Sequence, residues 1–154
     1  MSMEKQPAYT LYSDEYFMNE ALKEANKAFE KDEVPIGAVV VIENRIIARA
    51  HNLTETLHDV TAHAEMQAFT AASDYLGGKY LNECILYVTL EPCTMCTGAA
   101  FWAQLGKLVY GADDQKRGYR LIQQRLLHPK TEVVPEILSE QSINLLKKFF
   151  KKKR

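Results

Sequence analysis

The segment Cys84–Leu90 reads Cys-Ile-Leu-Tyr-Val-Thr-Leu, and this near-continuous apolar run constrains the fold more than any other part of the chain. Such a run is typical of a strand buried on both faces, because neither face offers the alternating polar residues that solvent would favour. A helix is predicted directly after it, from about Cys93 to about Leu105. The run therefore predicts a sheet that lies between two layers of helices.

The rest of the chain alternates helices and strands, as such a layered fold requires. An early pair of strands with a turn at Glu43-Asn44 predicts a β-hairpin, which would make the sheet mixed. We therefore expect a single domain over residues 1–154 with an α/β fold, a three-layer α/β/α sandwich with a central mixed sheet. The other predicted helices are Glu15–Lys31, a helix from near Ala62 to Gly77-Gly78, and Ser139–Lys152; the other predicted strands are Ile36–Ile42, Arg45–Ala50, Lys107–Tyr110 and Glu132–Val134.

The composition favours a soluble, cytoplasmic protein that has no membrane partner. The chain of 154 residues is 47% apolar and has a net charge of -1, so any nucleic-acid binding must come from a local basic patch. No apolar run approaches the roughly 20 residues that a membrane-spanning helix needs. The three cysteines are an odd number in a chain without a signal-like start, which argues against a disulfide framework.

Two short motifs at predicted helix starts carry the chemistry. The first is His63-Ala-Glu65, and the second is Pro92-Cys-Thr-Met-Cys96. Cys93 and Cys96 share a helix face, and with His63 they offer two thiolates and one imidazole, a ligand set suited to zinc. Three protein ligands leave a fourth position for water, as in catalytic zinc sites, and zinc lowers the pKa of that water to about 7. We expect one zinc ion per chain.

Glu65 lies two residues after His63, a separation that on an ideal helix turns the two side chains to nearly opposite sides. We therefore interpret Glu65 as a catalytic residue in the pocket that moves a proton, and not as a fourth ligand. Taken alone, the Cys-x-x-Cys pair could also be a redox pair, half of a structural zinc site or two buried thiols. The combination of His-x-Glu with Pro-Cys-x-x-Cys is the signature of zinc-dependent nucleobase deaminases.

The sequence resembles the cytidine-deaminase-like superfamily, and within it the bacterial tRNA-specific adenosine deaminases. The resemblance covers most of the chain from Asp14 onward and implies that His63, Cys93 and Cys96 bind zinc while Glu65 transfers protons. It also implies that Asn52 and the backbone of Ala64 bind the base, although Asn52 read by itself is a turn residue. The matching segments are Val34–Val39, Asn52, His58–Glu65, Leu86–Ala99, Val109–Ala112, Asp114, Lys116, Gly118 and the final Phe-Phe with its basic neighbours.

The resemblance implies a tRNA partner, bound at its anticodon loop, and a homodimer. A basic cluster at the end of the chain is the most prominent charge asymmetry, and it predicts contacts with the RNA backbone. The alternative for this cluster is a solvated, frayed helix end. Residues 119–125 are bulkier and more basic than the family pattern. The candidate RNA-binding residues are Asp114, Lys116, Phe149, Phe150, Lys151, Lys152, Lys153 and Arg154.

Three functions are compatible with these motifs. The first is hydrolytic deamination of adenosine to inosine at the wobble position of tRNA. The second is the same reaction on a free base or nucleoside, such as guanine, cytosine or cytidine, which would need no basic face. The third is a non-catalytic RNA-binding module stabilised by zinc, against which Glu65 argues because a structural site needs no proton carrier.

Overall fold

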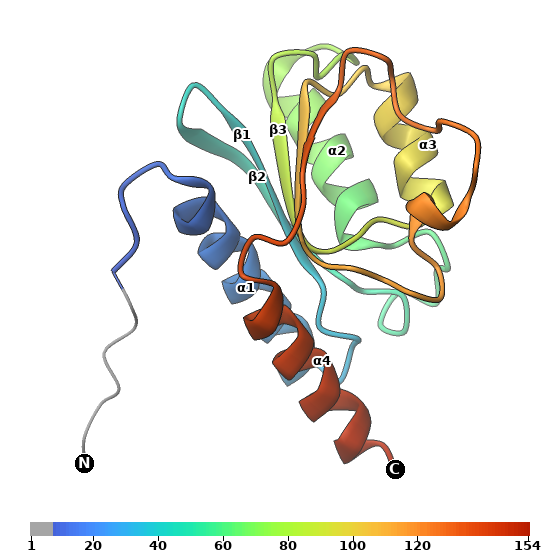
Figure 1. The fold of residues 1–154 in the computed structure, drawn as a ribbon. Coiled ribbons are helices and arrows are strands. Elements are labelled where there is room, and N and C mark those ends of the chain that lie inside the picture. The colour runs from blue at the N-terminus through green and yellow to red at the C-terminus, as the bar shows by residue number, and fades with distance from the viewer. Residues whose placement is uncertain (1–7) are drawn as a thin grey trace.

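The computed structural model of the chain describes residues 8–154, which form one five-stranded sheet between two layers of helices (Figure 1). The strand order is β2-β1-β3-β4-β5. Strand β1 pairs antiparallel with β2 and β3, whereas β3, β4 and β5 are parallel. This arrangement confirms the predicted three-layer sandwich with a central mixed sheet. The strands are β1 (Gly37–Ile42), β2 (Arg45–His51), β3 (Ile85–Leu90), β4 (Lys107–Ala112) and β5 (Glu132–Val134).

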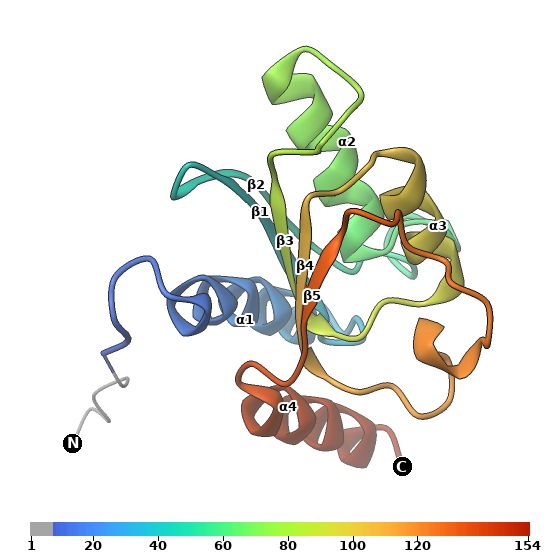
Figure 2. The same cartoon turned by 45° about the horizontal axis from the view of Figure 1, so that its top comes forward.

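Helices α1 (Asp14–Glu30) and α4 (Ser139–Lys152) cover one face of the sheet, and α2 (Ala64–Leu76) and α3 (Thr94–Trp102) cover the other (Figure 2). Side chains alternate between the two faces along each strand, so the central strands contribute to two separate cores. In β3, Tyr87 packs under α1, while Leu86 and Val88 pack under α2 and α3. The apolar run that the sequence analysis singled out is therefore buried on both faces, as predicted. Within residues 8–154, no helix combines the length and the apolar character needed to cross a membrane.

Local signals explain where several elements begin and end. The Ser13 hydroxyl accepts a hydrogen bond from the Tyr16 amide and so caps α1, as predicted. Glu43 and Asn44 both have positive φ angles, 48° and 60°, which suit the tight turn between β1 and β2. Gly77 ends α2 with a φ of 68°, a conformation that glycine adopts without strain.

Two helix ends differ from the predictions by more than one residue, and one short element was not predicted. Helix α3 ends at Trp102, before Leu105, because Gln104 has a left-handed φ of 54°. Helix α2 starts at Ala64 because His63 is extended, with φ -68° and ψ 152°. A short 3₁₀ turn at Tyr119–Leu121 was not predicted. The second of these differences affects the candidate active site.

Candidate active site

The two sequence motifs meet at one edge of the sheet. His63 is the residue that caps the start of α2, and Cys93 is the corresponding residue of α3. Cys96 lies in the first turn of α3 and is buried. Strand β3 ends at Leu90, so its carboxyl end delivers Glu91, Pro92 and Cys93 to this edge. The fold thus brings two helix starts together, where backbone N–H groups and the helix dipoles favour thiolates.

The predicted ligand atoms converge. The His63 Nδ1 atom lies 3.6 Å from the Cys93 Sγ atom and 3.5 Å from the Cys96 Sγ atom. All three ligand atoms lie within 4.8 Å of one another, a group that could hold a metal ion. Three side chains of this kind leave a position of a tetrahedral metal open to a further ligand.

The three side chains of this cluster differ in their pKa values. The Cys96 thiol donates a hydrogen bond to Cys93, and together with His63 it lowers the pKa of the Cys93 thiol to about 3. The same hydrogen bond, with burial, raises the pKa of Cys96. The hydrogen bond to Cys93 also raises the pKa of the His63 imidazole. Metal binding requires all three ligands without these protons, so it must displace protons from the cluster.

Glu65 faces the cluster from the first turn of α2. Its side chain is 4% exposed, burial raises the pKa of its carboxyl group, and its charge helps to raise the pKa of Cys96. The helical spacing used in the sequence analysis does not apply here, because His63 is extended and only Glu65 is helical. The carboxyl group can therefore approach the same centre that His63 faces.

Asn52 and Ala64 lie at the same edge. Ala64 is fully buried and is the first helical residue of α2. Asn52 follows β2; its Oδ1 atom accepts a hydrogen bond from the Thr54 amide, and its Nδ2 group donates to the Val34 carbonyl at 3.4 Å. These contacts are those of a turn residue, the alternative that the sequence left open. Base binding by Asn52 stays a prediction.

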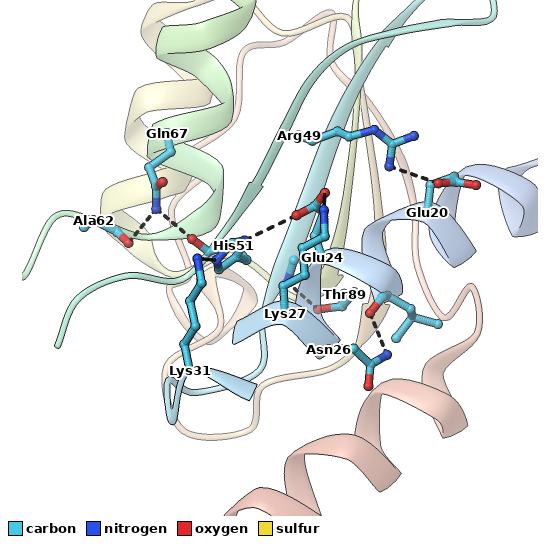
Figure 3. A network of polar contacts seen from close by, with 12 residues as sticks. Glu20, Glu24, Asn26, Lys27, Lys31, Arg49, His51, Ala62, Gln67 and Thr89 are labelled. Atoms are coloured by element: carbon cyan, nitrogen blue, oxygen red, sulfur yellow. Dashed lines mark hydrogen bonds and ion pairs between the residues drawn. The ribbon is translucent and has the colours of Figure 1, made fainter. Parts of the chain in front are cut away.

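Polar contacts connect the start of α2 with the end of β2 and with α1 (Figure 3). The Gln67 amide donates to the His51 carbonyl at 2.8 Å and to the Ala62 carbonyl at 3.0 Å, so it ties the end of β2 to the residue before His63. The His51 ring lies between Glu24, at 3.3 Å from Nδ1, and Lys31, at 3.0 Å from Nε2. Sequence reasoning missed Gln67, because its role depends on the approach of a strand 16 residues away.

The predicted RNA-binding residues divide into two groups. The Asp114 carboxylate accepts hydrogen bonds from the Lys116 and Arg117 amides and shapes a loop beside the cluster. Phe149 is buried against Phe29 of α1, with ring centroids 6.0 Å apart, so it anchors α4. Phe150 is 46% exposed.

The basic cluster at the end of α4 is partly paired. Lys152 and Lys153 both form ion pairs with Asp32, which follows α1. Lys151 and Arg154 are exposed. Asp32 precedes Glu33, whose carboxylate accepts hydrogen bonds from the Glu55 and Thr56 amides. The basic cluster therefore lies beside the loop that leads to His63.

Comparisons with known proteins agree on one kind of enzyme. Residues 12–154 match the MafB19-like deaminase family. The tRNA-specific adenosine deaminase of Bacillus subtilis (strain 168) is 48% identical over 146 residues, which cover 92% of this chain and 91% of that protein. That of Agrobacterium fabrum (strain C58 / ATCC 33970) is 45% identical over 144 residues, 90% of this chain and 95% of that one. A structure solved in studies of A-to-I editing by tRNA:A34 deaminases superposes with a TM-score of 0.79 and 45% identity, over 85% of this chain and 99% of that chain.

Proposed function

The chain belongs to the MafB19-like deaminases, in the cytidine-deaminase-like group that includes the tRNA-specific adenosine deaminases; it is therefore a hydrolytic deaminase, and we propose that it converts adenosine to inosine at the wobble position of tRNA. The observation that carries the proposal is the cluster of His63, Cys93 and Cys96 with the buried Glu65 beside it. A non-catalytic module stabilised by metal would not need a buried carboxylate at this place.

We propose zinc as the metal of this cluster. Zinc binds thiolate sulfur at about 2.3 Å and imidazole nitrogen at about 2.0–2.1 Å, so tetrahedral geometry places the two ligand atoms about 3.5 Å apart. The separations of 3.5 Å and 3.6 Å between the His63 Nδ1 atom and the two sulfur atoms match this value. When bound, zinc supplies an activated water with a pKa near 7.

The protein's own groups would then do three things. Glu65 takes a proton from the attacking water and delivers it to the amino nitrogen that leaves C6 of adenine as ammonia. The low exposure of Glu65 keeps bulk water away from this transfer. We propose that the backbone amide of Ala64, at the start of α2, binds the base, as the family resemblance implies.

The tRNA substrate is supported by the basic end of α4 beside the loop that leads to His63. Neutralising backbone phosphates supplies affinity that a free-base enzyme does not need. We also propose that the enzyme acts in the cytoplasm as a homodimer. Phe101 and Trp102 at the end of α3 are 37% and 78% exposed, and such aromatic residues are enriched in interfaces. Sedimentation of the purified protein tests the dimer, which a monomeric mass would contradict.

The experiment that tests the function measures ammonia release and inosine formation by the zinc-loaded protein. The substrates are a tRNA with adenosine at the wobble position, the same tRNA with guanosine there, and free adenosine, guanine, cytosine and cytidine. Turnover of the wobble-adenosine tRNA alone is expected. A guanine deaminase from Bacillus subtilis is 39% identical over 66% of this chain and 65% of that chain, with a TM-score of 0.63, so guanine is the second candidate. Turnover of guanine without turnover of the tRNA would favour it.

A further inference from the structure

Glu91, which joins β3 to the Cys93 segment, is a buried acidic residue that the mechanism above does not use. It is 3% exposed. One carboxylate oxygen, Oε1, accepts a hydrogen bond from the Asp114 amide at 3.1 Å, and the other, Oε2, accepts one from the Arg120 amide at 3.0 Å. The Arg120 guanidinium also lies 3.5 Å from Oε1. Every one of these donors belongs to a single loop, residues 113–120.

The same loop is shaped to receive this carboxylate. A Cβ atom on Gly118 would lie 2.3 Å from the Glu91 Oε2 atom and 2.6 Å from the Asp114 carbonyl oxygen, closer than real contacts allow. The backbone of Gly118 is extended, with φ -63° and ψ 144°, so any residue could adopt it. Glycine is therefore needed at position 118 because the main chain there lies close to the Glu91 carboxylate and the Asp114 carbonyl. It is not needed for an unusual backbone conformation.

Further contacts place the loop against the ligand segment. The Tyr119 amide donates to the Pro92 carbonyl at 3.0 Å, and the Glu91 amide donates to the Ala112 carbonyl at 2.8 Å. The Arg120 guanidinium pairs with Asp113 and lies over the Tyr110 ring, 5.4 Å from its centroid. One of these hydrogen bonds joins the loop to Pro92, the residue before Cys93. The other joins Glu91 to the end of β4, which leads into the loop.

We propose that Glu91 is a positioning residue, which holds loop 113–120 in the conformation that receives the RNA beside the metal-binding cluster. A carboxylate suits this task because its two oxygens bind amides from the two ends of the loop at once, and hydrogen bonds to a charged acceptor are the strong ones. The inference rests on the proposed function, since the loop's ligand is the RNA of that reaction.

The first variant is Glu91→Gln, which keeps the shape but sets an amide N–H against one of the two loop amides in either orientation. We expect hydrogen exchange at residues 113–121 to become about tenfold faster or more, the order expected when a buried hydrogen bond is lost. The KM for the wobble-adenosine tRNA should rise about tenfold, with kcat at saturating RNA and zinc content nearly unchanged. General destabilisation would lower the active fraction, and hence kcat, without this change in KM.

The matched control is Tyr87→Phe, which removes a 2.8 Å hydrogen bond to Asp14 on the α1 face of β3, the strand that precedes Glu91. It should leave exchange at 113–121 and the KM as in the unmodified chain. The second variant, Gly118→Ala, disrupts the same contact from the side of the loop. It should reproduce both effects of Glu91→Gln. In the double variant the effects on KM should be less than multiplicative, because both changes break one contact.

Unchanged exchange at 113–121 in Glu91→Gln would overturn the proposal, as would an equal rise in KM for Tyr87→Phe. Multiplicative effects in the double variant would also overturn it. The exchange outcome is measured without substrate, so it is separate from a failure of the proposed function. That failure would appear as an unmodified enzyme with no activity on the tRNA.

Discussion

Four acidic side chains are buried in the described part of the chain, and their partners separate their roles. Glu24 accepts from Lys27 and His51, while Glu33 and Glu91 accept main-chain amides of other segments. These three carboxylates are held in place by donors that a proton transfer would disturb. Glu65 instead faces the Cys96 thiol and the His63 ring. A carboxylate that must gain and lose a proton needs such a position.

Glu65→Gln should keep the fold and the metal and lose nearly all turnover. The amide fills the same volume but cannot carry a proton from water to the leaving nitrogen. General acid–base catalysis is worth about 10² to 10⁴-fold, so a loss of at least this size is expected in single-turnover deamination. Elemental analysis gives the zinc content. Deamination within threefold of the unmodified rate would contradict the role, and loss of zinc would show that Glu65 is a ligand.

Cys96→Ala should lose both zinc and stability. Metal binding is coupled to folding, and a metal present at 100 times its Kd stabilises the folded state by about 2.7 kcal/mol. Calorimetry of the variant should therefore give a lower Tm, and addition of zinc should not restore it. Cys84→Ala is the matched control, because Cys84 is equally buried but lies outside the cluster. Full zinc occupancy in Cys96→Ala would refute its assignment as a ligand.

The sequence predicted which residues gather at the site better than how they are oriented. His63, Cys93 and Cys96 follow from motif spacing, because each motif opens a helix. The orientation of Glu65 does not follow, since it depends on the extended backbone of His63. Glu91 and Gln67 were missed for another reason. Their partners lie in distant loops and strands, and no local pattern in one sequence identifies such partners.

At the scale of elements, α4 combines an anchoring face with a basic end. Phe149 packs on Phe29, and the Lys152 ammonium lies 4.8 Å from the centroid of the same ring. The bounds of α4, Ser139–Lys152, agree with the prediction because a strong apolar stripe defined them. Ring packing and the pairs with Asp32 could not be predicted, since they depend on how α1 and α4 lie side by side (Figure 2).

Deleting Lys151–Arg154 should weaken tRNA binding and reduce its dependence on salt. Each cation that neutralises a phosphate adds about 0.7 to the slope of log affinity against log salt on single-stranded RNA. Single-turnover deamination at saturating RNA should be preserved. The measurement is a binding titration at several salt concentrations. Equal affinity and equal slope in both proteins would remove this end of the chain from RNA recognition.

Asp32→Asn provides the opposite test of the same element. Removing the carboxylate frees Lys152 and Lys153 from their ion pairs, so the slope should become steeper and binding tighter. The cost in folding stability should be small, since solvent-exposed ion pairs contribute little. An unchanged slope would indicate that these two lysines do not reach the RNA.

At the scale of the whole molecule, the ionisation of Glu33 makes the stability of the fold depend on pH. Burial opposes its charge, but the amides of Thr56 and Glu55 outweigh this, so the pKa of its carboxyl group lies below the ordinary value of 4.5. A pKa that is lower in the folded state stabilises the protein above pH 4.5, and the contribution is lost as the pH falls through the folded pKa.

Glu33→Gln should therefore reduce the free energy of unfolding at pH 7 by about 1–3 kcal/mol, the cost of poorly paired buried amides. The variant should also lose less stability than the unmodified chain between about pH 5 and pH 3, roughly the range in which an acidic group titrates. Urea unfolding at both ends of this range measures the difference. Parallel curves for the two proteins would exclude Glu33 as a source of acid sensitivity.

The placement of the metal-binding residues sets an order of events during synthesis of the active enzyme. His63 is 30 residues from Cys93 along the chain, and β3 lies between them. Before β3 has paired with β1 and α2 has packed on the sheet, the cysteine pair offers two ligands and the third is elsewhere. A metal ion can then be held firmly only after the centre of the sheet has formed. Metal uptake in a refolding experiment would consequently report the moment at which β3 has paired with β1 and α2 has packed on the sheet, whether or not the later elements of the chain have formed.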